Sequence, residues 1–222
     1  MRRLINWLLR LFFRLLYHEM AWIYDWVAAL VSLGMWKDWV NCVLPYLGDG
    51  SILELGQGPG HLQAELLKTG HQVIGLDASP QMSRQAARRL RKQGYHPNLV
   101  RGLAQSLPFG KDRFRSVVAT FPSEYIVDPL TLAEIQRVLE PGGQAVILAL
   151  AWITGKKWLE RAAGWLFRIT DQAPEWQDRF LDPVRKAGLQ VHVDWVELKT
   201  SRLVIILAQK PSKLWRAEKK NF

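Results

Sequence analysis

Residues 54–60 read ELGQGPG, and this short stretch is the strongest indication of the fold. It completes SILEL at 51–55, an apolar run that suits a short buried strand, and it leads into a segment with helical periodicity. Glycines in such a turn let the backbone approach a ligand closely, because side chains at Gly56, Gly58 and Gly60 would occupy the same space. The stretch therefore predicts a ligand-binding turn between a strand and a helix.

The segments around this turn alternate between strand-like and helix-like patterns. Strands are expected at 51–55, 72–76, 98–102, 115–120 and 144–150, and helices at 60–69, 80–92 and 129–139. Further on, the sequence predicts a helix at 178–187 and a closing antiparallel pair at 189–197 and 202–208. Strict alternation implies an α/β fold with a doubly wound, mostly parallel seven-stranded sheet of the Rossmann-like kind.

An acid at the end of the second expected strand indicates which class of ligand the turn binds. Asp77 can accept hydrogen bonds from two ribose hydroxyls, which fits an adenosine-bearing ligand. A dinucleotide-binding turn would have a further glycine where this chain has His61. Glu54, just before the turn, opposes a pyrophosphate and favours a cationic or amino-bearing ligand. A glycine turn that binds nothing is the structural alternative.

Composition limits the class of protein. A chain of 222 residues suits one domain with additions, and its high apolar content argues against disorder. The formal net charge of +10 indicates a polyanionic neighbour, either nucleic acid or an anionic membrane. Cys42 is the single cysteine, and no Cys/His cluster has metal-ligand spacing. We therefore expect a reducing compartment, no internal disulfide and no metal.

Four motifs resemble, in order, those of the class I S-adenosylmethionine-dependent methyltransferases. They are ELGQGPG at 54–60, GLDASPQM at 75–82, GLAQSLPF at 102–109 and IQRVLEPGG at 135–143, and the match covers about residues 50–150. The resemblance implies S-adenosyl-L-methionine as the cofactor. It also implies cofactor contacts at Glu54, Gly56, Gly58, Gly60, Asp77, Ala78, Ala104 and Gln105.

The same resemblance divides these residues by the part of the cofactor they contact. The glycines line the methionine and ribose portion, Asp77 holds the ribose, and Ala104 with Gln105 lies beside the adenine. One position departs from the family, which usually has an acid where this chain has Leu103. That acid accepts from the adenine amino group, so Gln105 or a backbone carbonyl is expected to substitute for it.

A shorter resemblance links the N-terminal segment to the ubiquinone and menaquinone C-methyltransferases of the methyltransferase type 11 group. It rests on Tyr24 and Asp25, on SLG at 32–34, and on Trp36 and Trp39. It implies that Tyr24 covers the active site. The C-terminal third departs from those enzymes, and so does FPSEY at 121–125.

Candidates for catalysis follow the fourth expected strand, because ligands of open α/β sheets bind at the carboxyl ends of strands. Glu124 or Tyr125 would act as a general base if the acceptor is a hydroxyl or an acidic ring carbon. In the alternative interpretation Glu124 is a solvated loop residue and Tyr125 is a packing aromatic.

The two ends of the chain are basic and rich in tryptophan. We expect an amphipathic helical segment at 1–46 and a methyltransferase domain at 47–222. The domain would comprise a cofactor-binding core at 47–151, a substrate-cover insertion at 152–180, and a closing helix and strands at 181–210. The N-terminal segment would begin with a helix at 3–18 that has a thin arginine edge on a wide apolar face, as interfacial helices do.

This pattern predicts a cytoplasmic protein bound peripherally to the inner face of an anionic membrane. Alternatively, the N-terminal helix packs on the enzyme's own core or on a second copy in a homo-oligomer. No transmembrane helix is expected. No nucleic-acid partner is expected either, since a solvated helix face explains the basic run at 84–92.

Three functions are consistent with these features. The first is methyl transfer to a hydrophobic, membrane-borne small molecule such as a quinol, a polyprenyl phenol or a lipid. The second is a soluble methyltransferase for a small metabolite, with the N-terminal segment as a lid or oligomer contact. The third is a non-catalytic, cofactor-binding assembly partner of membrane enzymes.

Overall fold

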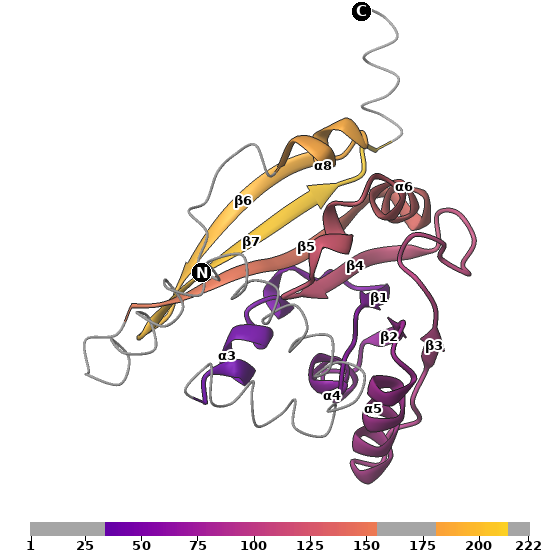
Figure 1. Ribbon diagram of the computed structural model, residues 1–222, viewed down its shortest axis with the longest axis vertical. Helices are drawn as coiled ribbons and strands as arrows, with labels where there is room; N and C mark the ends of the chain where they lie inside the picture. The colour runs from indigo at the N-terminus through magenta and orange to yellow at the C-terminus, as the bar shows by residue number, and fades with distance from the viewer. Residues whose placement is uncertain (1–33, 155–180, 213–222) are drawn as a thin grey trace, which may run out of the picture.

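Seven strands form one sheet in the computed structural model, which describes residues 34–154 and 181–212. The strand order is β3-β2-β1-β4-β5-β7-β6 (Figure 1), and neighbours are parallel except that β7 runs antiparallel to β5 and β6. This confirms the predicted α/β sheet. The strands are β1 (Ser51–Leu55), β2 (Gln72–Asp77), β3 (Leu99–Arg101), β4 (Phe114–Thr120), β5 (Leu139–Ile153), β6 (Gln190–Glu197) and β7 (Ser201–Gln209).

The winding of the sheet reverses between β1 and β4. From β1 the chain proceeds to β2 and β3 on one side, and it then returns to β4 on the other side of β1. Ligands of open α/β sheets bind at such a reversal, in the crevice outside the carboxyl ends of the strands. The segments that follow β1, β2 and β4 are therefore where a site is expected.

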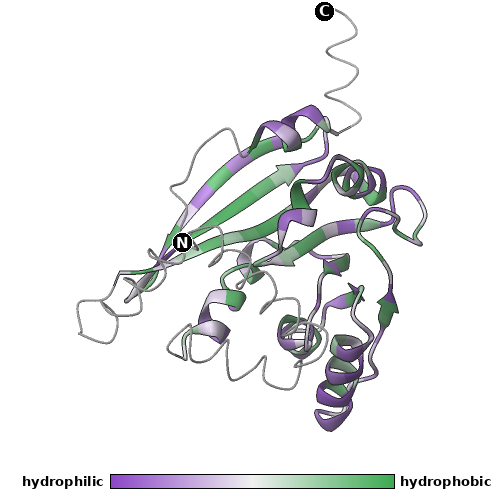
Figure 2. Cartoon of the chain, in the orientation of Figure 1, coloured by the Kyte–Doolittle hydropathy of each residue, from purple (hydrophilic) through white to green (hydrophobic). Residues whose placement is uncertain are grey.

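Helices cover both faces of the sheet (Figure 1). One apolar core joins α3 and α4 to the face that bears Ile52 and Val118, and a second joins α6 and α8 to the face that bears Leu53 and Val117. Figure 2 shows apolar β5 and β7 within the sheet and a polar α5 beside it. In the described residues the helices are α3 (Trp36–Asn41), α4 (His61–Lys68), α5 (Pro80–Lys92), α6 (Pro129–Val138) and α8 (Asp182–Lys186), with 3-10 turns η1 (Leu44–Tyr46) and η2 (Glu124–Val127).

Local sequence signals explain where α5 and α6 begin. Ser79 caps α5 by accepting a hydrogen bond from the Met82 N–H, and Asp128 caps α6 by accepting one from the Leu130 N–H. Each helix then starts with proline, whose missing N–H costs nothing at the first position of a helix. Both caps lie in segments that follow the carboxyl ends of strands, Ser79 after β2 and Asp128 after β4.

The fifth strand is longer than predicted at both ends. Leu139 already pairs with Phe114, and pairing resumes at Gln144 after the PGG turn at 141–143, which lies between the helix and the strand that the sequence predicts. A Cβ at Gly143 would lie 2.8 Å from the Arg115 carbonyl oxygen, so glycine is needed there. At the other end Trp152 pairs with Arg202, and so belongs to the sheet instead of opening the insertion.

Several predictions concern residues outside the described ranges. These are the amphipathic helix at 3–18, Tyr24, most of the insertion at 152–180 and the first residues of the helix expected at 178–187, of which α8 is described from Asp182. Within the described ranges, no helix is both long and apolar enough to cross a bilayer.

Candidate active site

The glycine turn after β1 has the conformation that its sequence requires. Gly56, Gly58 and Gly60 all have positive φ, at 69°, 51° and 81°. A Cβ on Gly60 would lie 2.9 Å from the Cβ of Ala86 in α5, so this glycine lets α5 pack against the turn. Among the described residues other than its two chain neighbours, a Cβ on Gly58 would meet no heavy atom closer than the Gly56 carbonyl oxygen, at 4.0 Å. The backbone at Gly58 is therefore open to a ligand, as a cofactor cradle requires.

Asp77 lies beside this turn at the end of β2. Its Oδ2 accepts a hydrogen bond from the Gly58 N–H at 2.9 Å, and its Oδ1 accepts one from the Ser79 N–H at 2.7 Å. The Gly56 N–H also donates to the Leu76 carbonyl, at 2.7 Å. These bonds hold an acceptor group next to the open backbone of Gly58, which suits the ribose-binding role that the resemblance implies.

Glu54 supports the turn from inside the protein. It is 2% exposed, and its Oε2 accepts a hydrogen bond from the Gln63 amide of α4 at 2.9 Å. Burial raises the pKa of Glu54 to about 8; the nearby charge of Asp77 also raises it, and the bond from Gln63 opposes the shift. Glu54 thus carries less charge at neutral pH than the sequence suggests, which weakens the argument from its charge against a pyrophosphate.

Two buried glutamines beside Glu54 escaped the sequence analysis. Gln57 and Gln63 are almost fully buried, and both lie over Gly75 of β2. A Cβ on Gly75 would lie 2.9 Å from the Gln57 Oε1 and 3.0 Å from the Gln63 Nε2. The glycine within a strand was the available signal, because such a position often marks a close approach by another group.

The loop that carries Ala104 and Gln105 begins against Asp77. The Gly102 N–H donates to the Asp77 carbonyl at 3.1 Å, and Ala104 is buried. Leu103 is 59% exposed and has no polar side-chain atom. The Gln105 amide nitrogen donates to Asp128 Oδ2 at 3.3 Å. The loop thus places Gln105 between the end of β3 and the start of α6.

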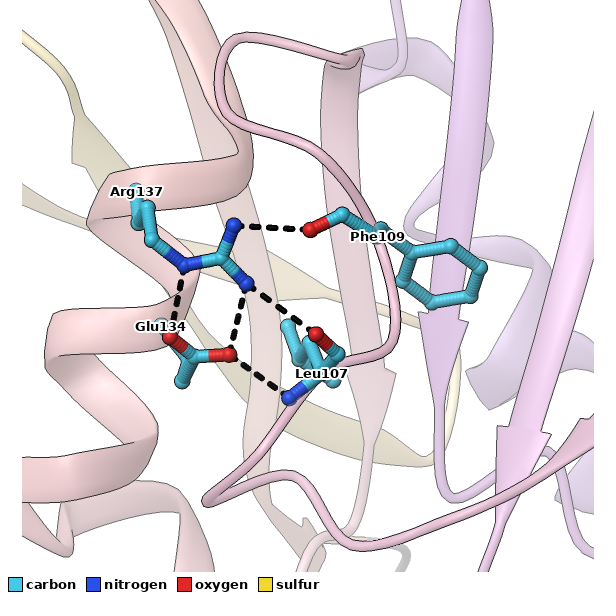
Figure 3. Close-up of polar contacts among 4 residues, drawn as sticks. All are labelled: Leu107, Phe109, Glu134 and Arg137. Atoms are coloured by element: carbon cyan, nitrogen blue, oxygen red, sulfur yellow. Dashed lines mark hydrogen bonds and ion pairs between the residues drawn. The ribbon is translucent and has the colours of Figure 1, made fainter.

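An ion pair on α6 fixes the far end of this loop (Figure 3). Arg137 donates to the carbonyl oxygens of Phe109 and Leu107, at 2.7 and 3.1 Å, and Glu134 accepts from the Leu107 N–H at 2.6 Å. The bond from Arg137 holds the pKa of Glu134 below its ordinary value. Arg137 lies within the motif at 135–143, but nothing in that motif indicates that its guanidinium holds the loop.

Of the two catalytic candidates, the structure brings one to the glycine turn. The Tyr125 hydroxyl donates to the Leu55 carbonyl at 3.2 Å, and a Cβ on Gly56 would lie 2.7 Å from it. Glu124 is exposed at the start of η2. Tyr125 therefore lies at the reversal between β1 and β4, and both catalytic roles stay predictions.

An aromatic cluster forms where β4 ends. Phe121 has a φ of 47°, which is rare for a residue with a side chain, and its ring centroid lies 4.9 Å from that of Trp36 and 6.0 Å from that of Trp39. Trp39 is buried, and its indole N–H donates to the Ser201 hydroxyl at 2.8 Å. Trp36 and Trp39, two of the residues on which the second resemblance rests, thus adjoin the segment that leads to Tyr125.

Comparisons with known proteins agree with this geometry. A model of the methyltransferase domain matches residues 52–143. A demethylmenaquinone methyltransferase of Clavibacter sepedonicus is 34% identical over 137 residues, which are 60% of this chain and 55% of that protein. An uncharacterised methyltransferase of Synechocystis sp. is 32% identical over 164 residues, which are 70% of this chain and 71% of that protein.

The fold is also similar to that of solved enzymes. A geranyl diphosphate C-methyltransferase from Streptomyces coelicolor superposes with a TM-score of 0.60 at 15% identity, covering 78% of this chain and 80% of the other. The chain spans about half the length of the Clavibacter relative. The extent of the Synechocystis match, together with the strand order and the glycine turn, shows that this chain belongs to the class I S-adenosylmethionine-dependent methyltransferases.

Proposed function

We propose that the protein transfers a methyl group from S-adenosyl-L-methionine to a hydrophobic, membrane-borne small molecule, such as a quinol, a polyprenyl phenol or a lipid. The observation that carries the proposal is the position of Tyr125, whose hydroxyl lies against the cofactor turn while an aromatic cluster adjoins the same segment. Similarity to a demethylmenaquinone methyltransferase supports a quinone-like acceptor. The interfacial pattern of residues 1–18 supports delivery from the cytoplasmic face of an anionic membrane.

When bound, S-adenosyl-L-methionine would supply an electrophilic methyl group on a sulfonium, with S-adenosylhomocysteine as the leaving group. The work of the protein is to align the nucleophile and to exclude water. The turn at 56–60 and Asp77 hold the donor. Trp36 and Phe121 offer an apolar surface to a ring-bearing acceptor. Tyr125, held by its bond to Leu55, orients the acceptor near the donor.

The experiment is a methyl-transfer assay with the full chain, labelled S-adenosyl-L-methionine and lipid extract in anionic liposomes. We expect labelled product in the lipid fraction and at least a tenfold lower rate for Tyr125→Phe, a loss of about 1.4 kcal/mol in transition-state stabilisation. Tyr95→Phe, which removes a tyrosine hydroxyl just after α5, is the matched control and should retain most of the activity. Absence of labelled lipid, with label instead in water-soluble metabolites, would contradict the membrane-borne acceptor.

A second candidate is the soluble methyltransferase that acts on a small metabolite. It is favoured by Trp39, because this described part of the N-terminal segment is buried against β7 through its bond to Ser201. Deletion of residues 1–18 distinguishes the two candidates. The soluble enzyme predicts lower thermal stability or a smaller assembly with no change in liposome binding, whereas the membrane enzyme predicts loss of liposome binding with the fold intact. A protein that binds the cofactor but shows no turnover with either fraction would support the assembly-partner function.

A further inference from the structure

The adenine subsite departs from its family at one position, and the structure offers a replacement. Leu103 stands where an acid would accept a hydrogen bond from the adenine amino group, and its side chain has no acceptor. The following loop residues bring Gln105 to Asp128, with the Gln105 amide nitrogen 3.3 Å from Asp128 Oδ2. An acid is thus present beside the subsite, although it comes from α6 and not from the loop after β3.

Asp128 is held in place by hydrogen bonds that do not involve Gln105. Its Oδ1 accepts from the Leu130 N–H at 2.9 Å as the cap of α6, and its own backbone N–H donates to the Tyr125 carbonyl at 3.2 Å. The second carboxylate oxygen, Oδ2, is the one that Gln105 contacts. A rigid carboxylate therefore faces the glutamine amide.

The chemistry of the two groups determines which end of the amide faces Asp128. A carboxylate only accepts hydrogen bonds, whereas an amide has two donors on nitrogen and an accepting oxygen. The Gln105 nitrogen must therefore face Asp128, which turns the amide oxygen away from it. In the described residues, that oxygen has no hydrogen-bond partner, and Gln105 is half-buried.

We propose that Gln105, oriented by Asp128, recognises the adenine amino group through its amide oxygen. Gln105 is the specificity-determining residue, and Asp128 is a positioning residue that acts through it. The pair selects adenine over a 6-oxo purine, because a 6-oxo purine presents an acceptor to the Gln105 oxygen. The proposal rests on the binding of S-adenosyl-L-methionine at this site and adds the residues that read its base.

The test compares two ligands that differ at this group, S-adenosylhomocysteine and its deaminated 6-oxo analogue S-inosylhomocysteine, by calorimetry on the full chain. We expect the wild type to bind the adenosyl ligand about tenfold more tightly, the worth of one good hydrogen bond. Gln105→Leu should lower the affinity for the adenosyl ligand about tenfold and leave the inosyl ligand nearly unchanged. Gln72→Leu, an exposed glutamine at the start of β2, is the matched control and should keep the wild-type preference.

Asp128→Asn provides the second arm because asparagine also caps helices and keeps α6 in place. An asparagine can donate as well as accept, so Gln105 is free to reverse its amide. We expect the adenosyl preference to shrink about tenfold or to reverse, with thermal stability close to that of the wild type. Asp49→Asn, an exposed acid ahead of β1, controls for the loss of one charge.

Results that would overturn adenine recognition by Gln105 differ from those that would overturn cofactor binding. Equal losses for both ligands in Gln105→Leu would assign the residue a structural role and overturn the recognition. An unchanged preference in both variants would overturn it as well, while leaving the cofactor assignment intact. Failure of the wild type to bind either ligand would overturn the cofactor assignment together with the proposal.

Discussion

Three glycine-to-alanine variants separate the packing role of the turn from its binding role. Gly58, Gly60 and Gly94 all have positive φ, so an alanine at each costs about 1–2 kcal/mol in backbone strain. At Gly60 the new methyl group would also lie 2.9 Å from the Ala86 Cβ and 3.1 Å from its Cα. Backbone cannot move aside cheaply, so overpacking adds about 1–3 kcal/mol.

The expected results therefore differ among the three variants. Gly94 lies just after α5, and no heavy atom of the described residues other than its chain neighbours lies within 4 Å of the added Cβ, so this variant should lose stability only through strain. Gly60→Ala should lose about 2–5 kcal/mol in the free energy of unfolding. Gly58→Ala should be about as stable as Gly94→Ala yet bind S-adenosyl-L-methionine at least tenfold more weakly, because its methyl group enters the open space at the turn.

Urea unfolding gives the stabilities, and calorimetric titration with the cofactor gives the affinities. Equal destabilisation by Gly60→Ala and Gly94→Ala would refute the packing argument. Wild-type affinity in Gly58→Ala would refute the claim that the ligand approaches the backbone there.

Three further predictions concern groups around the turn. Glu54→Gln tests the buried carboxyl. The pKa of Glu54 in the folded state, about 8, lies above its ordinary value of 4.5, so the folded state binds a proton that the unfolded state has released, and wild-type stability should fall as pH rises from about 4.5 through 8. In urea melts across this range, the variant should lose that part of the pH dependence. Arg137→Lys removes the forked hydrogen bonds to the Leu107 and Phe109 carbonyls and should lower the free energy of unfolding by about 1–3 kcal/mol. Amide hydrogen exchange in the loop 102–112 should become faster, and unchanged exchange there would contradict the role of Arg137 in holding the loop. Tyr125→Phe removes one hydrogen bond to Leu55, so unfolding should become easier by about 1 kcal/mol, and a stability equal to that of the wild type would show that the bond contributes nothing.

Much of the fold could be predicted because its signals are local. The glycine turn and the alternating periodicity each lie within a few neighbouring residues. The start of β5 could not be placed in this way. Leu139 joins the sheet because Phe114 is opposite it, and the PGG turn at 141–143 gives the same local signal whether it ends a helix or interrupts a strand.

The parts of the site that were missed depend on contacts between distant segments. Arg137 reaches loop carbonyls 28 and 30 residues earlier, and Gln105 meets Asp128 23 residues later. Sheet order brings these segments together, and no periodicity in the sequence encodes such a meeting. Glu54 shows the opposite limitation: its position was predicted, but its charge state depends on burial, which one sequence motif does not reveal.

Calorimetric titration of the full chain tests the central claim most directly, with S-adenosyl-L-methionine and NAD as ligands and Asp77→Ala as the variant. We expect S-adenosyl-L-methionine to bind at a Kd on the order of micromolar, Asp77→Ala to bind it at least tenfold more weakly, and NAD not to bind. Asp49→Ala, which removes an exposed acid at the opposite edge of the sheet, should bind as the wild type does. Binding of NAD in place of S-adenosyl-L-methionine, or equal affinities in the wild type and Asp77→Ala, would contradict the account.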